Sequence, residues 1–403
     1  MRYSKEEVIQ FVNEEDVQFV RLDFCDVFGK RKNISIMPEE LPRAFEYGIA
    51  FDASAIAGFG DETRSDLLLH PDPDTLMLLP WRPEHGKMIR MFCTISYPDG
   101  TLFDRDTRSL LKKAVADAAS LGYSYSFGTE QEFYLFELDE NGRPTKIPYD
   151  TAGYMDTAPE DRCDNIRREI CLTLEKMGIR PESAHHEEGP GQNEIAFRYS
   201  DALTATDDAM TFRSVVKTIA RRNGLFADFS PKPLENCPGN SFHVNISVQP
   251  SGGKENLYYM IAGIMNRIEE MTAFLNPTEE SYKRLGHNKA PSYISWSHEN
   301  RSQLIRIPAA VGEYFRAELR SPDPTANPYL AFTLLIYAGL YGLTEKPALA
   351  VPADINMYTA DPAVLSSYRR LPHDLGLACR IAAGSEFIRE HVPEAILDIY
   401  CGR

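Results

Sequence analysis

A short segment, FGTEQEFYLF at residues 127–136, constrains the fold of this chain more than any other feature. Its composition predicts a β-strand, and the two-residue period of a strand puts Glu130 and Glu132 on one face, about 6–7 Å apart. Because aromatic and aliphatic residues follow on both faces, we expect the strand to be buried on both sides. Buried carboxylates need a metal ion or another cation nearby, so the segment predicts a charged site inside the protein.

A second acidic segment surrounds a Gly-Pro-Gly turn in PESAHHEEGPGQNEIAF. The turn can fold the chain back and bring Glu187 and Glu194 toward one point. The neighbouring His185, His186 and Glu188 favour a solvated surface loop, because the run HHEE is polar throughout. On its own, this segment does not specify a site.

A third segment, CPGNSFHVNIS, alternates polar and apolar residues, as a half-buried strand does. The alternation puts His243, Asn245 and Ser247 on one face. A single histidine in such a strand is usually a core residue whose hydrogen bonds are satisfied. Its meaning therefore depends on the acidic strands that accompany it.

Arginines dominate the last polar segments. In EYFRAELRSPDP, strand alternation puts Arg316, Glu318 and Arg320 on one face, a set of charges that an apolar core would not tolerate. The segment ENRSQLIRIP adds Arg301 and Arg306. Guanidinium groups match the geometry of phosphate and carboxylate, so these segments predict bound anions.

Together, these segments predict phosphoryl transfer. Ligands that are mostly oxygen favour Mg²⁺ or Mn²⁺ over Zn²⁺. Divalent cations beside arginines are the groups that phosphoryl transfer requires. The sequence has neither a GxxxxGK[ST] loop nor a kinase signature, so we expect another fold to bind the nucleotide.

The composition fits a globular cytoplasmic enzyme. A chain of 403 residues with 43% hydrophobic side chains can bury a large core. Its formal net charge of −16 would repel nucleic acids and anionic membranes. The seven scattered cysteines fit a reducing cytosol. The N-terminus lacks the apolar stretch of a signal peptide, and the most apolar segment, 329–343, is too short to span a bilayer.

The pattern of elements changes near residue 103. Before this point, Ser4 and Glu7 form a capping-box signature for a first helix, and alternation around Gly29 predicts two paired strands. A Pro-rich stretch and the strand MIRMFCTISY complete this small α+β unit. After it, long helices are predicted at 109–121, 207–222 and 255–275, with another beginning at Asn327-Pro328. We therefore expect domains at 1–103 and 104–403.

In this order, the segments resemble those of the glutamine synthetase family, in particular its bacterial type I branch. The family's motifs occur here as FDASAIAGF, DRDTRS, GTEQEFYLF, HHEEGPGQNEI, PGNSFHVNIS, NRSQLIRIP and RAELRSPDPTANPYLAF. The resemblance extends over nearly the whole chain. It implies an α+β fold, with a small N-terminal β-grasp domain followed by a C-terminal catalytic α/β barrel. It also implies a homo-oligomer, a dodecamer of two six-membered rings, with each active site between neighbouring subunits.

The resemblance further implies a role for individual residues. One metal site would be formed by Glu132, Glu187 and Glu194, and the other by Glu130, His243 and Glu318. Residues that would bind ATP are Ser247, Arg301, Arg306 and Arg316. Residues that would bind glutamate are Gly239, His243, Arg284 and Arg320. The catalytic residues implied are Asp52, Arg301 and Arg320.

The implied reaction is an ATP-dependent ligation that needs Mg²⁺ or Mn²⁺. The γ-carboxylate of glutamate is phosphorylated first, because a free carboxylate is a poor electrophile, and cations neutralise charge on the transferred phosphoryl group. Ammonia then displaces phosphate, which gives glutamine, ADP and phosphate. Asp52 of the neighbouring subunit would help to bind and deprotonate ammonium, which requires that this carboxylate stay ionised.

Three departures from the family pattern concern the acceptor and the assembly. The family carries a glutamate in a flap just before an Ala-Pro pair, whereas RLGHNKAP has Lys289, which would repel ammonium. Pro238 precedes Gly239 where asparagine is usual, which affects the contacts of the glutamate amino group. The family usually continues beyond a point like IYCGR, which bears on ring stacking.

These departures leave two alternatives open. One is a γ-glutamyl ligase for a different amine, and the other is a non-catalytic paralogue that acts as a sensor or assembly protein. The complete set of carboxylates argues against the paralogue, because buried carboxylates are costly without metal. The Asp-Leu-Pro that follows a modifiable tyrosine in some relatives is absent after Tyr358, so we predict no adenylylation.

Overall fold

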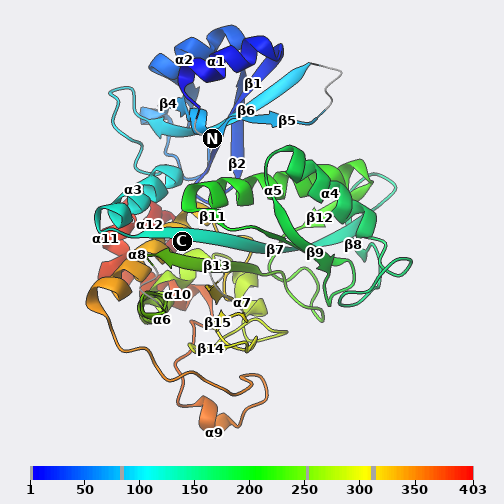
Figure 1. The fold of residues 1–403 in the computed structure, drawn as a ribbon, viewed down its shortest axis with the longest axis vertical. Helices are drawn as coiled ribbons and strands as arrows, with labels where there is room; N and C mark the ends of the chain where they lie inside the picture. The colour runs from blue at the N-terminus through cyan, green and yellow to red at the C-terminus, as the bar shows by residue number, and fades with distance from the viewer. Residues whose placement is uncertain (1–2, 82–85, 251–253, 310–314, 403) are drawn as a thin grey trace. The chain divides into compact units, whose positions relative to one another are not determined.

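The structure is a computed structural model that describes residues 3–81, 86–250, 254–309 and 315–402. The chain divides into two compact units (Figure 1). The first unit ends at Leu110 and also takes in Thr173–Ile179, and the second comprises Leu111–Leu172 and the chain from Arg180 onward. A functional boundary at residue 103 stays a prediction.

The first unit is a mixed sheet with short helices. Its strands lie in the order β2-β1-β6-β4-β3, and β5 pairs with β6. The predicted pairing around Gly29 is confirmed, because β1 and β2 are antiparallel with Val20 opposite Ile36. The strands are β1 (Val17–Cys25), β2 (Arg31–Ile36), β3 (Ile49–Asp52), β4 (Asp66–Pro71), β5 (Met77–Leu79) and β6 (Lys87–Ser96). The helices are α1 (Lys5–Glu14), α2 (Leu41–Tyr47) and the 3₁₀ turns Pro38–Glu40, Glu62–Arg64 and Pro73–Thr75.

Local signals explain how this unit begins. The Ser4 hydroxyl accepts a hydrogen bond from the Glu7 backbone N–H, and the Glu7 carboxylate accepts one from the Ser4 N–H, so the predicted capping box is confirmed. The Pro-rich stretch begins at the end of β4 and contains β5, two strands that alternation did not predict. Pro71 is the last residue of β4, a position where its missing N–H disturbs little pairing.

The second unit is built around the long strand β7 (Ser124–Leu138). The sheet order is β14-β15-β16-β13-β7-β10-β9, and β8, β11 and β12 also pair with β7. Phe133, Tyr134, Leu135 and Phe136 are all 0% exposed, which confirms the expected burial on both faces. The other strands are β8 (Pro144–Pro148), β9 (Pro181–His186), β10 (Gln192–Phe197), β11 (Ser200–Asp201), β12 (Leu225–Asp228), β13 (Phe242–Gln249), β14 (Trp296–His298), β15 (Ile305–Ile307) and β16 (Ala317–Leu319).

The other helices of the described residues are labelled in Figure 1. The bounds are α3 (Thr107–Ser120), α4 (Asp164–Lys176), α5 (Ala202–Arg222), α6 (Glu255–Leu275), α7 (Glu279–Arg284), α8 (Pro328–Glu345), α9 (Pro362–Leu365), α10 (Leu375–Gly384), α11 (Glu386–His391) and α12 (Glu394–Cys401). The predicted start of α8 is confirmed, because the Asn327 side chain accepts from the Tyr329 N–H and Pro328 follows as first helical residue. The prediction for α5 began too late, since Asp201 caps the helix by accepting from Leu203 and Thr204.

Helices α6 and α8 pack backbone to backbone. A Cβ on Gly263 would lie 2.2 Å from the Ala338 carbonyl oxygen, and one on Gly342 would lie 2.0 Å from that of Tyr259. Helix α8 is buried along almost its whole length, as its apolar sequence predicts. Within the described ranges, no helix is both long and apolar enough to cross a membrane.

Candidate active site

A polar pocket of about 370 Å³ lies in the second unit. It brings together most of the residues that the sequence singled out. Its lining comprises Glu130, Glu132, Tyr154, Met155, Ser183, His185, Glu187, Glu188, Gln192, Glu194, Ala196, Pro238, Gly239, Ser241, His243, Asn288, Lys289, Arg301, Arg306 and Arg320. Carboxylates and arginines therefore converge in one space.

Strand register explains the first group of possible metal ligands. On β7, Glu130 stands opposite His243 of β13 on one side and Ala196 of β10 on the other. Glu130, Glu194 and His243 each offer a ligand atom within 4.8 Å of the others. His243 Nδ1 lies 3.4 Å from Glu130 Oε2 and 3.6 Å from Glu318 Oε1. Neighbouring strands thus deliver carboxylates and one imidazole to the same point.

A second group of possible ligands lies beside the first. His185, Glu187 and Glu194 also offer atoms within 4.8 Å of one another, with His185 Nε2 at 2.8 Å from Glu187 and 3.9 Å from Glu194. The structure therefore brings Glu187 and Glu194 together across the Gly-Pro-Gly turn. Sequence reasoning did not favour His185 as a ligand, although its pairing opposite Glu194 in the β9–β10 ladder places it there.

Electrostatics in the pocket favour bound cations. Burial and the neighbouring Glu187 carboxylate raise the pKa of Glu132, and burial and Glu130 raise that of Glu194. Burial and Arg320 hold the pKa of His243 well below its ordinary value, and its buried Nε2 has no hydrogen-bond partner among the described residues. A neutral imidazole and crowded carboxylates are the ligand set that divalent cations bind.

Arginines surround Glu318, which is fully buried on β16. Arg306 Nε lies 2.7 Å from Glu318 Oε2, and Arg320 Nη1 donates to Oε1 at 2.5 Å. Arg316 Nε donates to Asn245 Oδ1 at 2.8 Å, and Asn245 in turn donates to Glu130 at 2.9 Å. The arginines are therefore linked to Glu318 on β16 and, through Asn245, to Glu130 on β7.

The wall near Gly239 is tightly packed. A Cβ there would lie 2.3 Å from the Pro231 carbonyl oxygen and 2.8 Å from Arg284 Cγ. Buried Arg284 donates to the Ser321 carbonyl and to Ser241 Oγ, each at 2.8 Å. Arg284 thus stands behind the pocket wall and shapes it from outside the lining.

Three other predicted residues also lie outside the lining. Glu318 contacts the lining residues Arg306 and Arg320. Arg316 is linked to the lining residue Glu130 through Asn245. Ser247, opposite Ser126 in β13, is half-buried and is not among the lining residues.

Asp52 belongs to the first unit. It is exposed at the end of β3, and hydrogen bonding from the Ser54 N–H lowers the pKa of its carboxyl. It therefore stays ionised, as its predicted role requires.

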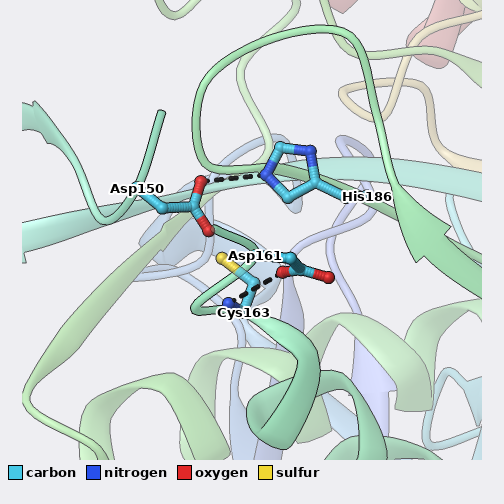
Figure 2. Close-up of side chains that lie close together, drawn as sticks. All are labelled: Asp150, Asp161, Cys163 and His186. Carbon is cyan, nitrogen blue, oxygen red and sulfur yellow. Dashed lines mark hydrogen bonds and ion pairs between the residues drawn. The ribbon is translucent and has the colours of Figure 1, made fainter. Parts of the chain in front are cut away.

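A buried cluster next to the pocket corrects one expectation. His186 is fully buried, so the prediction of a solvated loop is wrong for this residue. Figure 2 shows it beside Asp150, with Asp161 and Cys163 close by. His186 Nε2 donates to Asp150 at 2.9 Å and Nδ1 donates to the Glu187 carbonyl at 2.7 Å. Although burial opposes both shifts, these bonds lower the pKa of Asp150 to about 2 and raise that of His186.

The four side chains of this cluster have the types that bind metal, but protein groups already occupy them. Asp161 pairs with the Arg167 guanidinium and also accepts from the Cys163 N–H. Burial raises the pKa of the Cys163 thiol, which stays protonated. The cluster is therefore a hydrogen-bonded anchor that holds the start of the loop bearing Glu187.

Comparison with known proteins identifies the family. A model described as "Glutamine synthetase, catalytic domain" matches residues 104–402, and one described as "Glutamine synthetase, beta-Grasp domain" matches residues 16–98. The chain belongs to the glutamine synthetase family. The family resemblance of the motifs, the α+β fold with its N-terminal β-grasp domain and the prediction of a glutamine synthetase family ligase are confirmed.

Relatives in the glutamine synthetase family match the chain along its whole length. A glutamine synthetase of Clostridium saccharobutylicum is 43% identical and covers 99% of this chain and 94% of its own. One of Methanosarcina mazei is 42% identical, with coverages of 98% and 92%. A solved GmaS/ADP complex is 28% identical, with a TM-score of 0.87 and coverages of 97% and 93%. Plasmodium falciparum glutamine synthetase, at 23% identity, has the same fold, with a TM-score of 0.86 and coverages of 100% and 95%.

Proposed function

We propose that this chain makes glutamine from glutamate, ammonia and ATP. The observation that carries the proposal is the convergence of two groups of possible metal ligands on Glu194, beside the arginines around Glu318. Transfer of a phosphoryl group to a carboxylate brings several negative charges together, so it needs cations on both partners. The relatives named glutamine synthetase, which match over almost the full length, support the same activity.

Mg²⁺ or Mn²⁺ would bind at two sites in this pocket. The residues proposed to hold them are Glu132, Glu187 and Glu194 at one site and Glu130, His243 and Glu318 at the other. When bound, the metals neutralise charge on the phosphates. Two observations support this assignment: the buried His243 Nε2 has no hydrogen-bond partner among the described residues, and several carboxylates crowd around Glu194.

The arginines and the pocket wall act on the substrates. Arg301, Arg306 and Arg316, with Ser247, are proposed to bind ATP, and forked guanidinium groups would hold its phosphates in line with the acceptor. Gly239, His243, Arg284 and Arg320 are proposed to form the glutamate site. At this site, the tight wall would fix the γ-carboxylate for attack. Arg301 and Arg320 would also stabilise charge during transfer.

The proposed enzyme would act as a cytoplasmic homo-oligomer, a dodecamer of two six-membered rings. Asp52 supports a shared site, because it is ionised and exposed on the first unit. In the proposed assembly it would reach the pocket of a neighbouring subunit and deprotonate ammonium there. Native mass spectrometry of the purified protein would test the number of subunits.

The test of the activity is phosphate release from ATP with Mg²⁺ and glutamate, with and without ammonium. Release that ammonium stimulates, with glutamine as product, is the expected result. If no phosphate is released with ammonium or with any other amine, the proposal is contradicted. Glutamate-dependent ATP hydrolysis that Glu318→Ala abolishes would exclude a non-catalytic paralogue.

A second candidate is a γ-glutamyl ligase for a different amine. The observation that favours it is the position of Lys289, which lines the pocket beside Tyr154 and Glu188. Such a cation would change the acceptor site while leaving the phosphoryl transfer groups intact. A panel of amines distinguishes the two candidates, because a specialised ligase would turn over another amine faster than ammonium.

A further inference from the structure

Two loops of the second unit meet at the pocket through an ion pair. Lys289 Nζ, in the flap after α7, binds Glu188 Oε1 in the loop after β9. The same ammonium group lies 5.5 Å from the centroid of the Tyr154 ring. All three residues line the pocket. The contact thus joins the flap to the loop that also bears Glu187.

Glu188 stands on a loop that is fixed at both ends. At its start, His186 donates to Asp150, as Figure 2 shows, and also to the Glu187 carbonyl. At its end, Asp150 accepts from the Gly191 N–H at 2.9 Å. One buried aspartate therefore holds both sides of this turn. Glu188 offers the flap a carboxylate on a rigid support.

Lys289 stands on a tight loop with a strained backbone. Asn288 and Lys289 both adopt left-handed conformations, with φ of 45° and 66°. Asparagine tolerates this region, but lysine does so at an energetic cost. Gly286 and Ala290 close the loop by a hydrogen bond of 2.9 Å. A strained lysine persists where other contacts hold it, and the ion pair with Glu188 is such a contact.

We propose that Glu188 and Lys289 form a latch that holds the flap over the pocket and sets the acceptor specificity. This inference rests on the proposed function. Since the two charges neutralise each other, an incoming cation meets the field of the remaining pocket carboxylates. Glu188 thereby compensates for the lysine that replaces the family's flap glutamate. The acceptor that fits this arrangement is a small protonated amine, ammonium included.

Charge substitutions distinguish two roles of the latch, which are closing the flap and compensating the charge of Lys289. Glu188→Gln and Lys289→Gln each break the latch, but only Glu188→Gln leaves a lysine charge uncompensated. The side chains of Glu188 and Lys289 are 38% and 49% exposed. Breaking their ion pair should therefore have a modest effect, about two- to fivefold. We expect Glu188→Gln to raise the KM for ammonium by at least this factor without changing the KM for glutamate. Lys289→Gln should not raise the KM for ammonium.

Hydrogen exchange of the flap, without substrates, measures closure independently of catalysis. Amide exchange over residues 284–290 should rise about two- to fivefold in both single variants and return to the wild-type rate in the charge swap, Glu188→Lys with Lys289→Glu. A matched control is Arg43→Gln, which breaks an exposed ion pair of 3.0 Å with Glu40 in the first unit. It should leave flap exchange unchanged.

Unchanged flap exchange in both single variants, or a swap that exchanges as fast as they do, would overturn the latch. Equal KM shifts for ammonium in the two single variants would overturn compensation by Glu188. A wild-type protein inactive with every amine would refute the proposed function, while the exchange result would still decide on the latch.

Discussion

Replacing Glu132 by glutamine should stabilise the metal-free protein, although the residue is a proposed metal ligand. Burial and the Glu187 carboxylate raise the pKa of Glu132 to about 8, from 4.5. Each pKa unit corresponds to about 1.36 kcal/mol. At pH 7 the Glu132 carboxyl is mostly protonated in the folded protein but ionised in the unfolded chain, and this difference opposes folding by about 3 kcal/mol. Glutamine carries no charge, and its amide oxygen can still accept from the Ser241 N–H and from Gln192.

The gain should depend on pH in a defined direction. A carboxyl group whose pKa is higher in the folded state contributes stability below its unfolded pKa and loses it as pH rises through its folded pKa. The free energy of unfolding of metal-free wild type should therefore fall between about pH 4.5 and pH 8 relative to that of Glu132→Gln. The variant should be more stable by about 2–3 kcal/mol at pH 7 and equally stable near pH 4.

A matched variant, Glu318→Gln, should behave in the opposite way. Arg306 and Arg320 contact both oxygens of Glu318, and removing one partner of a buried ion pair costs about 3–5 kcal/mol. This variant should be destabilised without metal, whereas Glu132→Gln is stabilised.

Denaturant unfolding in EDTA and in Mn²⁺ measures all of these effects. At one hundred times its dissociation constant, a metal stabilises the wild type by about 2.7 kcal/mol, and Glu132→Gln should lose most of this gain. The reasoning would be refuted if metal-free Glu132→Gln were less stable than the wild type. It would equally be refuted if Mn²⁺ stabilised the variant as much as the wild type.

Two other predictions follow from the pocket wall and from the proposed assembly. Gly239→Ala should cost about 1–3 kcal/mol in the free energy of unfolding and raise the KM for glutamate, because the added Cβ would lie 2.3 Å from the Pro231 carbonyl oxygen; unchanged unfolding and kinetics would contradict this. Asp52→Ala and Glu194→Gln should each be inactive, but dissociating, mixing and reassembling them should restore activity at about a quarter of the sites if each site takes Asp52 from a neighbour. No recovery in assembled mixtures would argue that sites are not shared.

Helices and strands were predicted best where a specific local pattern, such as a helix cap, marks them in the sequence. The caps at Ser4 and Asn327 and the apolar period of α6 gave correct boundaries, because each depends on residues within one or two helical turns. The start of α5 was missed because the capping residue Asp201 is followed by Ala-Leu-Thr-Ala-Thr, which lacks a clear apolar period. Short strands such as β5 depend on pairing with β6 and carry almost no signal of their own.

The site also has residues that local patterns predicted and contacts that they could not predict. Strand alternation put Glu130, His243 and Glu318 each on the polar face of its own strand, and the family resemblance implied that the three residues face one space. The burial of His186 could not be anticipated, because its partner Asp150 lies 36 residues away in the chain. The same holds for Glu188 and Lys289, which are 101 residues apart. Contacts between loops require knowledge of the fold, and a single sequence does not provide it.

The division between strands and loops has a consequence for engineering this protein. The proposed metal ligands Glu130, His243 and Glu318 lie on hydrogen-bonded strands, whereas Glu188 and Lys289 lie on loops. A library randomised at these two loop positions would sample new acceptor amines while the backbone that carries phosphoryl transfer stays the same. Selection for a new amide product could therefore start from this chain without rebuilding its use of ATP.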